Sequence, residues 1–464
     1  MMVWLAVRLV YNGARQLVPD EAYYWVWSRH LALGYLDHPP MVAWMISLTT
    51  YLFGDSEFGV RAGAAVLTLG SMLLVVALVR KIYPDKNAAA LAVWILLLCP
   101  MTAALGMIVT PDTPACFFSV AALFCAVKAI DSPRWWIVFG ICTGLALDSK
   151  YTSVLLPASV GLALLTSPAG RRQLASVWPW LGILVAALVF WPVVRWNQQH
   201  DWASFRFQFS HGTSEDASSP QANLGSYWGG QLGLYSPVLF VLGAIAVGGA
   251  WRRYRALTVA EQMLVFAATV PLVFFCAFAI RHRPEANWPV FAYWPMTVLL
   301  IRNSPPAKWL RTGLIVAASM TLVAHIPEII QLIPARTMAA IPNPWEEMFG
   351  WRQYGAELDR LSLGSPVYCT TYENAAEASF YMPGHPKVWT IDTNRPTAYD
   401  FFAGRPAVQS LARAVCVTRA GVSGEIPAEL KGFSVAEIES WETTALHRVV
   451  RRRRFIILDR RTHP

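Results

Sequence analysis

The sequence predicts a polytopic α-helical membrane protein with a small α/β domain near its C-terminus, and three observations support this fold class. The chain has 464 residues, of which 55% are hydrophobic and 14% charged, whereas soluble domains carry roughly 25% charged residues. Apolar runs of spanning length alternate with short segments rich in Gly, Pro and charge. From about residue 340 onward, shorter alternating patterns typical of strands replace them.

About eleven apolar segments come close to the roughly 20 residues that a membrane-spanning helix requires. They are approximately 2–18, 57–79, 87–108, 113–130, 135–147, 151–167, 175–196, 229–250, 260–280, 288–302 and 309–327. Residues 40–53 form a shorter apolar stretch that we expect to lie on the membrane surface. The first segment lacks a signal-peptide cleavage site. It is also short for a span, so two alternatives are open: a tilted, incomplete helix or a start further upstream.

Basic residues in the short loops predict the orientation. One set of loops carries Arg80, Lys81, Lys86, Lys128, Arg134, Arg171, Arg172, Arg252, Arg253, Arg255, Arg302, Lys308 and Arg311. The opposite set carries only Arg29, Lys150, Arg206, Arg281 and Arg283. The positive-inside rule makes the first set cytoplasmic. We therefore expect a transmembrane domain at 1–330, whose loop 19–56 faces the periplasm of a bacterium, and a periplasmic α/β domain at 338–464. The net charge of +9 is explained by these loops, and no nucleic-acid partner is indicated.

The C-terminal region has the pattern of a small α/β domain. Strands are expected at 367–371, 387–391, 414–418, 433–438 and 449–458, with a helix at 374–382. The run of four arginines at 451–454 has two open interpretations: contact with anionic lipid headgroups, or a solvated basic edge strand that discourages aggregation.

The stretch Pro19 to Pro40, PDEAYYWVWSRHLALGYLDHPP, concentrates polar groups beside membrane segments. Ionisable groups at the membrane are costly unless they serve a function, and the carboxylate of Asp20 could deprotonate an acceptor hydroxyl. The adjacent Glu21 could do the same, or only stabilise a helix start. Aromatic residues with polar edges accompany them, among them Tyr23 and Tyr24, and His38 follows.

Two further polar groups lie in predicted external loops. Asp112, in TPDTP, is either a functional carboxylate or a helix cap. Lys150, in DSK, is placed to bind a phosphate as a compact point charge; the alternative is an ion pair with Asp148 that closes a helical hairpin. Because these loops share one face with Asp20, we expect a composite site.

The stretch RHRPEANWP forms the last cluster. Arg281 and Arg283 could bind phosphate oxygens, Glu285 and Asn287 could bind sugar hydroxyls, and Trp288 could stack on a sugar. An ordinary polar turn with an interfacial Trp is the alternative. His38 and His282 have no defined ligand spacing, so no metal is assigned, although a divalent metal stays an open alternative. No Gly-rich phosphate loop is present, so the sequence predicts no cofactor.

The stretch PDEAYYWVWSRHLALGYLDHPPMVAW resembles the first external loop of bacterial glycosyltransferases similar to the dolichyl-phosphate-mannose–protein mannosyltransferases. These proteins share the GT-C membrane fold with the aminoarabinose transferase of lipid A. The stretches TPDTP, LALDSKYT, EANWP and YENAAEASFYMPG resemble further segments of that family. The resemblance covers nearly the whole chain in order.

The resemblance implies an inverting transfer of a sugar from a polyprenyl-phosphate donor at the periplasmic face of the bacterial inner membrane. Asp20 would be the first-loop catalytic Asp with Glu21 beside it, Asp112 the acidic residue of the second external loop, and Lys150 a contact of the donor phosphate. The acceptor would be lipid A or lipopolysaccharide, another glycan, or protein. The rival interpretation is a transporter or flippase of a lipid-linked saccharide, which usually shows internal repeats; none is evident here.

Overall fold

A computed structural model describes residues 1–213, 219–326, 328, 344–391, 393, 395–407, 411–419, 427–430, 432–445 and 448–460. Their contacts divide the chain into two compact units, both discontinuous in sequence. We call Met1–Tyr11, Ala32–Val42 and Arg61–His325 the helical unit, and Asn12–Leu31, Ala43–Val60 and Ile326–Pro464 the mixed unit. These units are defined by contacts. The predicted division into a transmembrane domain at 1–330 and a periplasmic domain at 338–464 stays a prediction.

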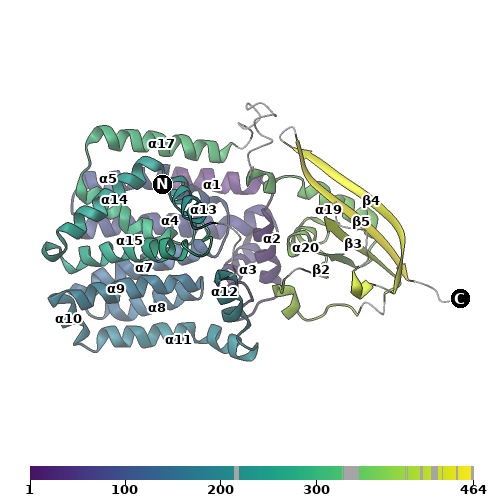
Figure 1. Ribbon diagram of the computed structural model, residues 1–464, viewed down its shortest axis with the longest axis horizontal. Helices are drawn as coiled ribbons and strands as arrows, with labels where there is room; N and C mark the ends of the chain where they lie inside the picture. Colours follow the sequence, from purple (N-terminus) through teal and green to yellow (C-terminus); the bar gives the residue numbers. More distant parts are fainter. Residues whose placement is uncertain are drawn as a thin grey trace. The chain divides into compact units, whose positions relative to one another are not determined.

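The helical unit consists of apolar helices and short connections (Figure 1). The helices lying entirely within it are α5 (Lys86–Leu98), α6 (Pro100–Met107), α7 (Asp112–Asp131), α8 (Trp135–Leu147), α9 (Leu155–Thr166), α10 (Pro168–Leu174), α11 (Trp178–Gln199), α12 (Ala203–Thr213), α13 (Pro220–Tyr235), α14 (Pro237–Arg252), α15 (Val259–Phe278), α16 (Tyr293–Asn303) and α17 (Ala307–His325), with the 3-10 turns η1 (Tyr151–Val154), η2 (Tyr254–Ala256) and η3 (Val290–Ala292). Helices α1 (Met2–Ala14), α3 (Met41–Phe53) and α4 (Glu57–Ile82) contribute residues to both units.

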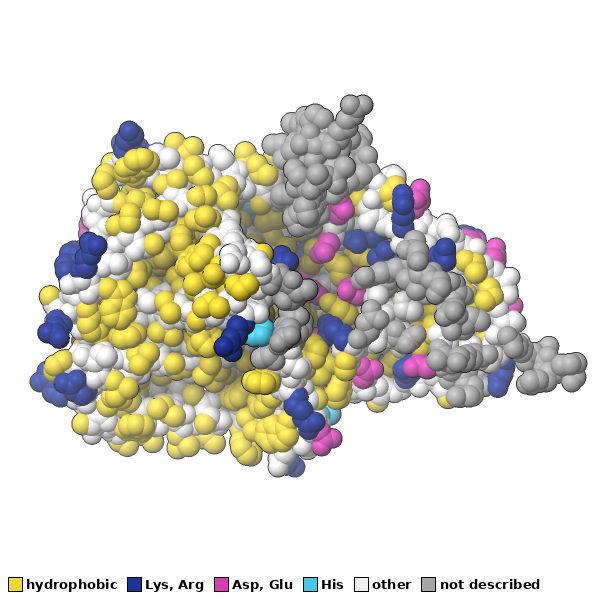
Figure 2. Space-filling model, viewed as in Figure 1, with side chains coloured by type: hydrophobic (Ala, Val, Ile, Leu, Met, Phe, Trp, Pro, Cys, Tyr) yellow, Lys and Arg dark blue, Asp and Glu magenta, His cyan; other side chains and the backbone are white. Residues whose placement is uncertain are grey.

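Several of these helices suit a lipid environment. Within the described residues, four are long and apolar enough to cross a membrane, namely α4, α7, α11 and α15, and the number rises to seven if three bent helix pairs each form one span. Only 22% of the most apolar window of α11 is buried, and its side chains Ile183, Leu184 and Leu188 are all more than half exposed. Figure 2 shows hydrophobic side chains over the flank of this unit and Lys and Arg side chains gathered at one end of it.

Two expected helices are broken. The apolar run at 87–108 divides into α5 and α6, which meet at an angle of 61°, and the run at 229–250 divides between α13 and α14, which meet at 101°. Ser236 lies between them at a φ of 75° and is followed by Pro237; Pro lacks the N–H that a continuing helix would need. The region 197–228, expected to be a loop, also contains α12 and the first turns of α13.

Small residues allow α8 and α11 to pack closely side by side (Figure 1). A Cβ atom built on Gly140 would lie 2.1 Å from the carbonyl oxygen of Gly182, and one built on Gly182 would lie 2.4 Å from the carbonyl oxygen of Trp136. Both contacts are with backbone and cannot be relieved by a side-chain rotation. This pair of glycines therefore fixes the distance between α11 and α8, the helix that precedes Asp148 and Lys150.

The mixed unit contains a five-stranded sheet in the order β2-β1-β3-β5-β4. Its strands are β1 (Val367–Cys369), β2 (Trp389–Thr390), β3 (Arg413–Arg419), β4 (Phe433–Ala445) and β5 (Arg448–Arg460). The first three pair in parallel and the last two join antiparallel. The short turns η5 (Pro344–Met348), η6 (Ala398–Phe401) and η8 (Ala428–Leu430) connect these elements, and helices α19 (Trp351–Ser362) and α20 (Tyr372–Tyr381) pack on the sheet (Figure 1).

The arginine run lies in β5, between β3 and β4, so its interpretation as an edge strand is wrong. Arg451 lies 3.7 Å from the ring centroid of Trp351 and donates to the carbonyl oxygen of Glu346. Arg453 donates to Asn374 Oδ1 over 2.7 Å. Because side chains alternate along a strand, these two arginines face the helices, and burial lowers the pKa of Arg451 to about 10.

Helix α2 (Pro19–Arg29) belongs to the mixed unit and packs on α20. Trp25 contacts Phe380 edge to face at 5.1 Å between ring centroids, and the backbone N–H of Leu17 donates to the hydroxyl of Tyr381 over 2.7 Å. Eight of the residues of α2, from Glu21 to Ser28, are buried. The chain segment that carries Asp20 is therefore a packed helix and not a solvated loop.

The glycine contact predicts a stability difference between two alanine substitutions. Gly140→Ala should lower the melting temperature by several degrees, because its Cβ would overlap the backbone of α11. Gly161→Ala, in α9, has nothing within 4 Å of its Cβ and should leave stability unchanged or raise it slightly. Thermal unfolding of the purified protein measures both; equal melting temperatures for the two variants would contradict the close packing.

Candidate functional site

A buried ion pair lies at one end of the helical unit. Lys150 Nζ is 2.6 Å from Asp112 Oδ1, and the two side chains are 9% and 6% exposed. Asn287 Nδ2 donates to the other carboxylate oxygen, Asp112 Oδ2, over 2.7 Å. Residues from three predicted external loops therefore meet at the Asp112 carboxylate, and the expected convergence is confirmed for these three loops.

Local structure places each of these groups. Asp112 lies in the first turn of α7, directly after Pro111. Lys150 follows α8 and precedes η1 in extended backbone, at φ −158° and ψ 131°. Asn287 lies in the turn before η3, where its carbonyl oxygen accepts from the N–H of Val290 over 3.1 Å. Each group thus comes from a chain segment where a helix starts or has just ended.

This geometry bears on the alternative roles given above for two residues. The hydrogen bonds of the Asp112 carboxylate are made by the side chains of Lys150, Asn287 and, at 3.5 Å, Thr110. A helix-cap role does not account for them. Lys150 binds Asp112 and not Asp148, so the prediction of a local Asp148–Lys150 pair is wrong. An ammonium group has three N–H donors, so Lys150 can bind Asp112 and still donate to a ligand.

Asp148 is a functional candidate that the sequence analysis treated only as a pairing partner for Lys150. Its side chain is buried, and Oδ1 has no hydrogen-bond partner among the described residues. Burial raises the pKa of Asp148 to about 7. Its carbonyl oxygen accepts from the N–H of Met41 over 3.0 Å, which ties the segment after Pro39 and Pro40 to the end of α8.

His38 and the aromatic residues near it adopt a folded turn. The N–H of Tyr35 donates to the carbonyl oxygen of His38 over 3.2 Å, and the hydroxyl of Tyr35 accepts from the N–H of Ala32 over 3.1 Å. The side-chain amide of Gln208, on α12, donates to the carbonyl oxygen of Asp37. Helix α12 therefore packs against the part of the first loop that belongs to the helical unit.

The RHRPEANWP cluster divides into exposed and packed side chains. Arg281, Arg283 and Glu285 are exposed, whereas His282 and Trp288 are partly buried. The His282 ring lies 4.8 Å from that of Phe278. The Trp288 ring packs against the rings of Phe275 and Phe278, with centroids 5.5 and 5.6 Å apart. The end of α15 therefore holds Trp288 in place.

Asp20 and its neighbours belong to the mixed unit. Asp20 Oδ1 accepts from the hydroxyl of Tyr372, on α20, over 3.2 Å. Glu21 is fully buried, and its Oε2 accepts from the backbone N–H of Val18 over 3.0 Å. That bond satisfies a donor at the helix start, so the structure gives Glu21 a capping role next to Asp20.

Tyr372, the partner of Asp20, belongs to a group of aromatic residues from α2 and α20. The hydroxyl of Tyr23 accepts from the N–H of Ala398 over 2.6 Å, and its ring lies 4.5 Å from that of Tyr372. Tyr24 contacts Trp27 edge to face at 5.0 Å. Arg395 lies 4.8 Å above the Tyr372 ring. Tyr372 and Arg395 were missed as site residues; the stretch that begins at Tyr372, YENAAEASFYMPG, was the available signal.

The buried pair predicts a double-mutant cycle. Asp112→Ala alone should destabilise the protein by about 3–5 kcal/mol, because it leaves the Lys150 ammonium buried without its counter-charge. Asp112→Ala combined with Lys150→Met removes both charges and should recover most of that stability without recovering function. Thermal unfolding of Asp112→Ala, Lys150→Met and the double variant measures the coupling; additive losses would show that the pair is not energetically linked.

Asp148 predicts a pH-dependent stability difference. Because its pKa is raised in the folded state, to about 7, the folded protein binds more protons than the unfolded chain between roughly pH 4 and 7. Its contribution to stability is therefore lost as the pH rises, by about 1 kcal/mol per pH unit in that window. Asp148→Asn should lose less stability than wild type between pH 5 and 8. Thermal unfolding at several pH values measures this. If the melting temperatures of the two proteins change with pH by the same amount between pH 5 and 8, the raised pKa of Asp148 is refuted.

Comparisons with known proteins support the resemblance. Residues 37–196 match the model of the family described as dolichyl-phosphate-mannose-protein mannosyltransferase. The chain is 29% identical over 309 residues to lipid A galacturonosyltransferase RgtD from Rhizobium johnstonii, covering 64% of this chain and 63% of that protein. It is 23% identical over 332 residues to the undecaprenyl phosphate-alpha-4-amino-4-deoxy-L-arabinose arabinosyl transferase from Erwinia tasmaniensis, covering 67% and 58%. The matches thus span about 60% of the length of these relatives.

Solved structures show the fold. ArnT from Cupriavidus metallidurans bound to undecaprenyl phosphate superposes with a TM-score of 0.68 at 16% sequence identity, over 98% of this chain and 96% of that one. The oligosaccharyltransferase AglB from Archaeoglobus fulgidus gives a TM-score of 0.53 at 12% identity, over 89% and 69%. The chain therefore has the GT-C fold of ArnT, and the resemblance to the bacterial relatives of the mannosyltransferase family is confirmed.

Proposed function

We propose that this chain is a membrane glycosyltransferase that moves a sugar from a polyprenyl-phosphate donor to an envelope acceptor. The buried cluster of Lys150, Asp112 and Asn287 carries this proposal. It holds the Lys150 ammonium in a buried site, and this group has N–H donors beyond the one that binds Asp112. Relatives named as lipid A galacturonosyltransferase and arabinosyl transferase, and the binding of undecaprenyl phosphate by ArnT, support this class of donor.

In the proposed reaction, an acceptor hydroxyl or amine attacks the anomeric carbon of the donor sugar. The bond between that carbon and the phosphate oxygen breaks, and polyprenyl phosphate leaves with the electron pair. Asp20 accepts the proton of the acceptor, and inversion follows from a single displacement. Lys150, with Arg281 or Arg283, stabilises the charge on the leaving phosphate.

The remaining residues have supporting roles in this proposal. Asp112 orients the Lys150 ammonium and, as an acidic residue of the second external loop, completes the catalytic set with Asp20 and Glu21. Glu21 positions Asp20 by fixing the start of α2. His38, His282, Glu285, Asn287 and Trp288, together with Tyr23 and Tyr24, are proposed contacts of the sugar, the phosphate or the acceptor. The proposal includes no metal, and the lipid-linked donor is a substrate and not a cofactor.

We further infer the membrane placement from sequence and composition. Eleven spans, the first near residues 2–18 and the last near 309–327, would place the proposed site and a C-terminal α/β domain at the periplasmic face of a bacterial inner membrane. The gathering of Lys and Arg at one end of the helical unit (Figure 2) supports this orientation. The acceptor class would be lipid A or lipopolysaccharide, another envelope glycan, or protein.

The proposal predicts a large loss of transfer for Asp20→Asn, about 10²–10⁴-fold, because the amide cannot accept the proton. Mass spectrometry of lipid A, core glycan and polyprenyl-phosphate sugars would compare envelope extracts of cells with the wild-type gene, the variant or a deletion. We expect the deletion and Asp20→Asn to lose one sugar mass from one acceptor and to accumulate the donor.

A matched control separates chemistry from folding. Asp131→Asn makes the same carboxylate-to-amide change in an exposed pair with Lys81, where such pairs contribute little, and should retain the modification at wild-type level. Full modification by Asp20→Asn at equal protein level would remove Asp20 from catalysis. Unchanged glycans in the deletion strain would contradict the transferase itself and favour the transporter alternative.

A further inference from the structure

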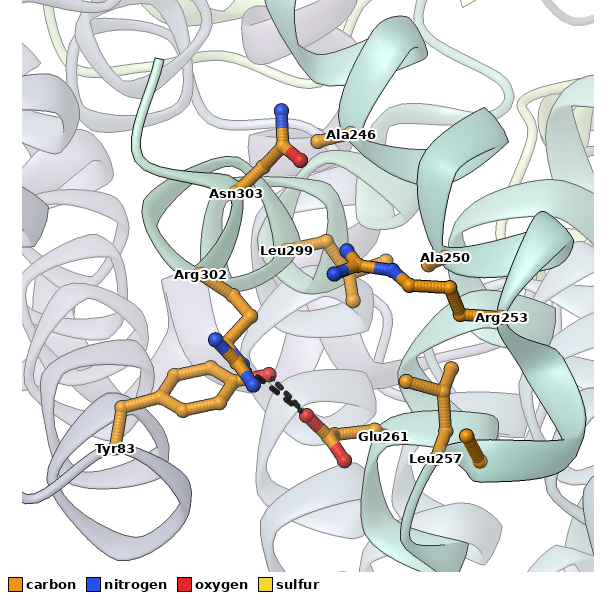
Figure 3. Close-up of a pocket in the computed structure, with 10 residues that line it drawn as sticks. Tyr83, Ala246, Ala250, Arg253, Leu257, Glu261, Leu299, Arg302 and Asn303 are labelled. Carbon is orange, nitrogen blue, oxygen red and sulfur yellow. Dashed lines mark hydrogen bonds and ion pairs between the residues drawn. The ribbon is translucent and has the colours of Figure 1, made fainter.

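A polar cavity lies at the C-terminal end of α16, whereas Asn287 precedes the N-terminal end of that helix. The cavity has a volume of about 160 Å³, and Figure 3 shows its lining side chains. Tyr83 follows the end of α4, Arg253 follows the end of α14, Glu261 lies in the first turn of α15, and Arg302 lies in the last turn of α16. Four helix ends of the helical unit therefore converge on this cavity, and none of its lining residues belongs to the proposed catalytic site.

The cavity's acidic residue is already satisfied. Glu261 Oε2 accepts from the N–H and the hydroxyl of Thr258, each over 2.9 Å. Its Oε1 accepts from the hydroxyl of Tyr83 over 3.1 Å and from Arg302 Nε over 3.4 Å. With donors on both oxygens, Glu261 holds the wall together and has little capacity left for a ligand.

The two guanidinium groups are not satisfied in this way. Arg253 donates through Nε to the carbonyl oxygen of Gly249 over 3.3 Å, and Arg302 donates through Nε to Glu261. Both arginines are exposed, and the Arg302 guanidinium also lies over the Tyr83 ring, 5.3 Å from its centroid, so the terminal nitrogens of both side chains are accessible to a ligand. Two arginines and one glutamate give the lining a net charge of +1, with both forks next to the cavity (Figure 3).

The other wall is apolar. Ala246 and Ala250, one turn apart on α14, and Leu299 on α16 are all buried and line the cavity. A guanidinium group can bind two oxygens of a phosphate group through its two terminal nitrogens. The apolar residues of α14 and α16 line the same cavity. This combination suits a ligand with a phosphate head and an apolar remainder. The cavity also lies among the basic loops that the positive-inside rule places in the cytoplasm, where anionic lipid attracts Lys and Arg.

We propose that this cavity binds the phosphate group of an anionic phospholipid headgroup, held by Arg253 and Arg302 and distinct from the proposed donor site. Free inorganic phosphate has the same recognition chemistry and is the alternative source of the ligand. The proposal does not depend on the transferase function, because it uses no residue of the Asp112 or Asp20 clusters. Bound lipid would join the ends of α14 and α16 across the cavity.

Binding of short-chain phosphatidylglycerol and of inorganic phosphate to the full-length protein in neutral detergent tests the proposal. Arg253→Gln combined with Arg302→Gln should weaken phosphatidylglycerol binding at least tenfold. The control combines Arg255→Gln with Arg311→Gln, which removes the same charge from two exposed arginines outside the cavity, and should change it less than twofold. Thermophoretic titration measures both affinities.

Each outcome is decisive. Loss of phosphatidylglycerol binding in the cavity variant alone supports a lipid site, and arginine-dependent binding of inorganic phosphate without the lipid assigns the cavity to free phosphate. Equal affinities of cavity and control variants for both ligands would overturn the proposal. If the double variant does not fold, Arg253→Gln alone serves, because among the described residues the Arg253 side chain bonds only to the carbonyl oxygen of Gly249, and the loss of that bond should leave the helical unit intact.

Discussion

The buried ion pair of Asp112 and Lys150 is the polar contact that constrains the proposed donor site. Two charges removed from water are tolerated only when each compensates the other and further hydrogen bonds satisfy what remains. Asn287 supplies such a bond, so three chain segments that lie up to 175 residues apart are fixed at one carboxylate. The close packing of α8 on α11 at Gly140 and Gly182 supports the segment that delivers Lys150. An enzyme that must hold one cation for a lipid phosphate gains from this rigidity.

The mixed unit shows the same principle with a different interaction. Helix α2 comes early in the chain but packs on α20, more than 340 residues later, through Trp25, Phe380 and the hydroxyl of Tyr381. This packing buries Glu21 and leaves Asp20 exposed beside Tyr372. The C-terminal region is therefore part of what positions the first-loop carboxylate. Its deletion would remove packing partners of α2 as well as a separate sheet.

Periodicity and composition predicted most helices and four of the five strands to within a few residues, because hydrophobic patterns are local; β4 continues seven residues beyond its predicted end at 438. The sequence could not reveal that α2 and α20 pack together, or that Lys150 pairs with Asp112 and not with Asp148, because these contacts join distant segments. The break between α13 and α14 was missed although Ser236-Pro237 signals it, since apolar residues continue on both sides. The interpretation of the arginine run as an edge strand failed because strand order is a tertiary property. The burial of Asp148 could not be predicted from the sequence either, because it depends on tertiary packing.

We propose that the chain forms a covalent product from a polyprenyl-phosphate sugar. A direct test uses purified protein in liposomes, given a labelled undecaprenyl-phosphate sugar on the side of the proposed site together with lipid A. We expect undecaprenyl phosphate to be released in equal amount to the lipid A that has gained the mass of the sugar. Movement of intact donor across the bilayer, with no phosphate released and no mass gained by lipid A, glycan or protein acceptors, would contradict it.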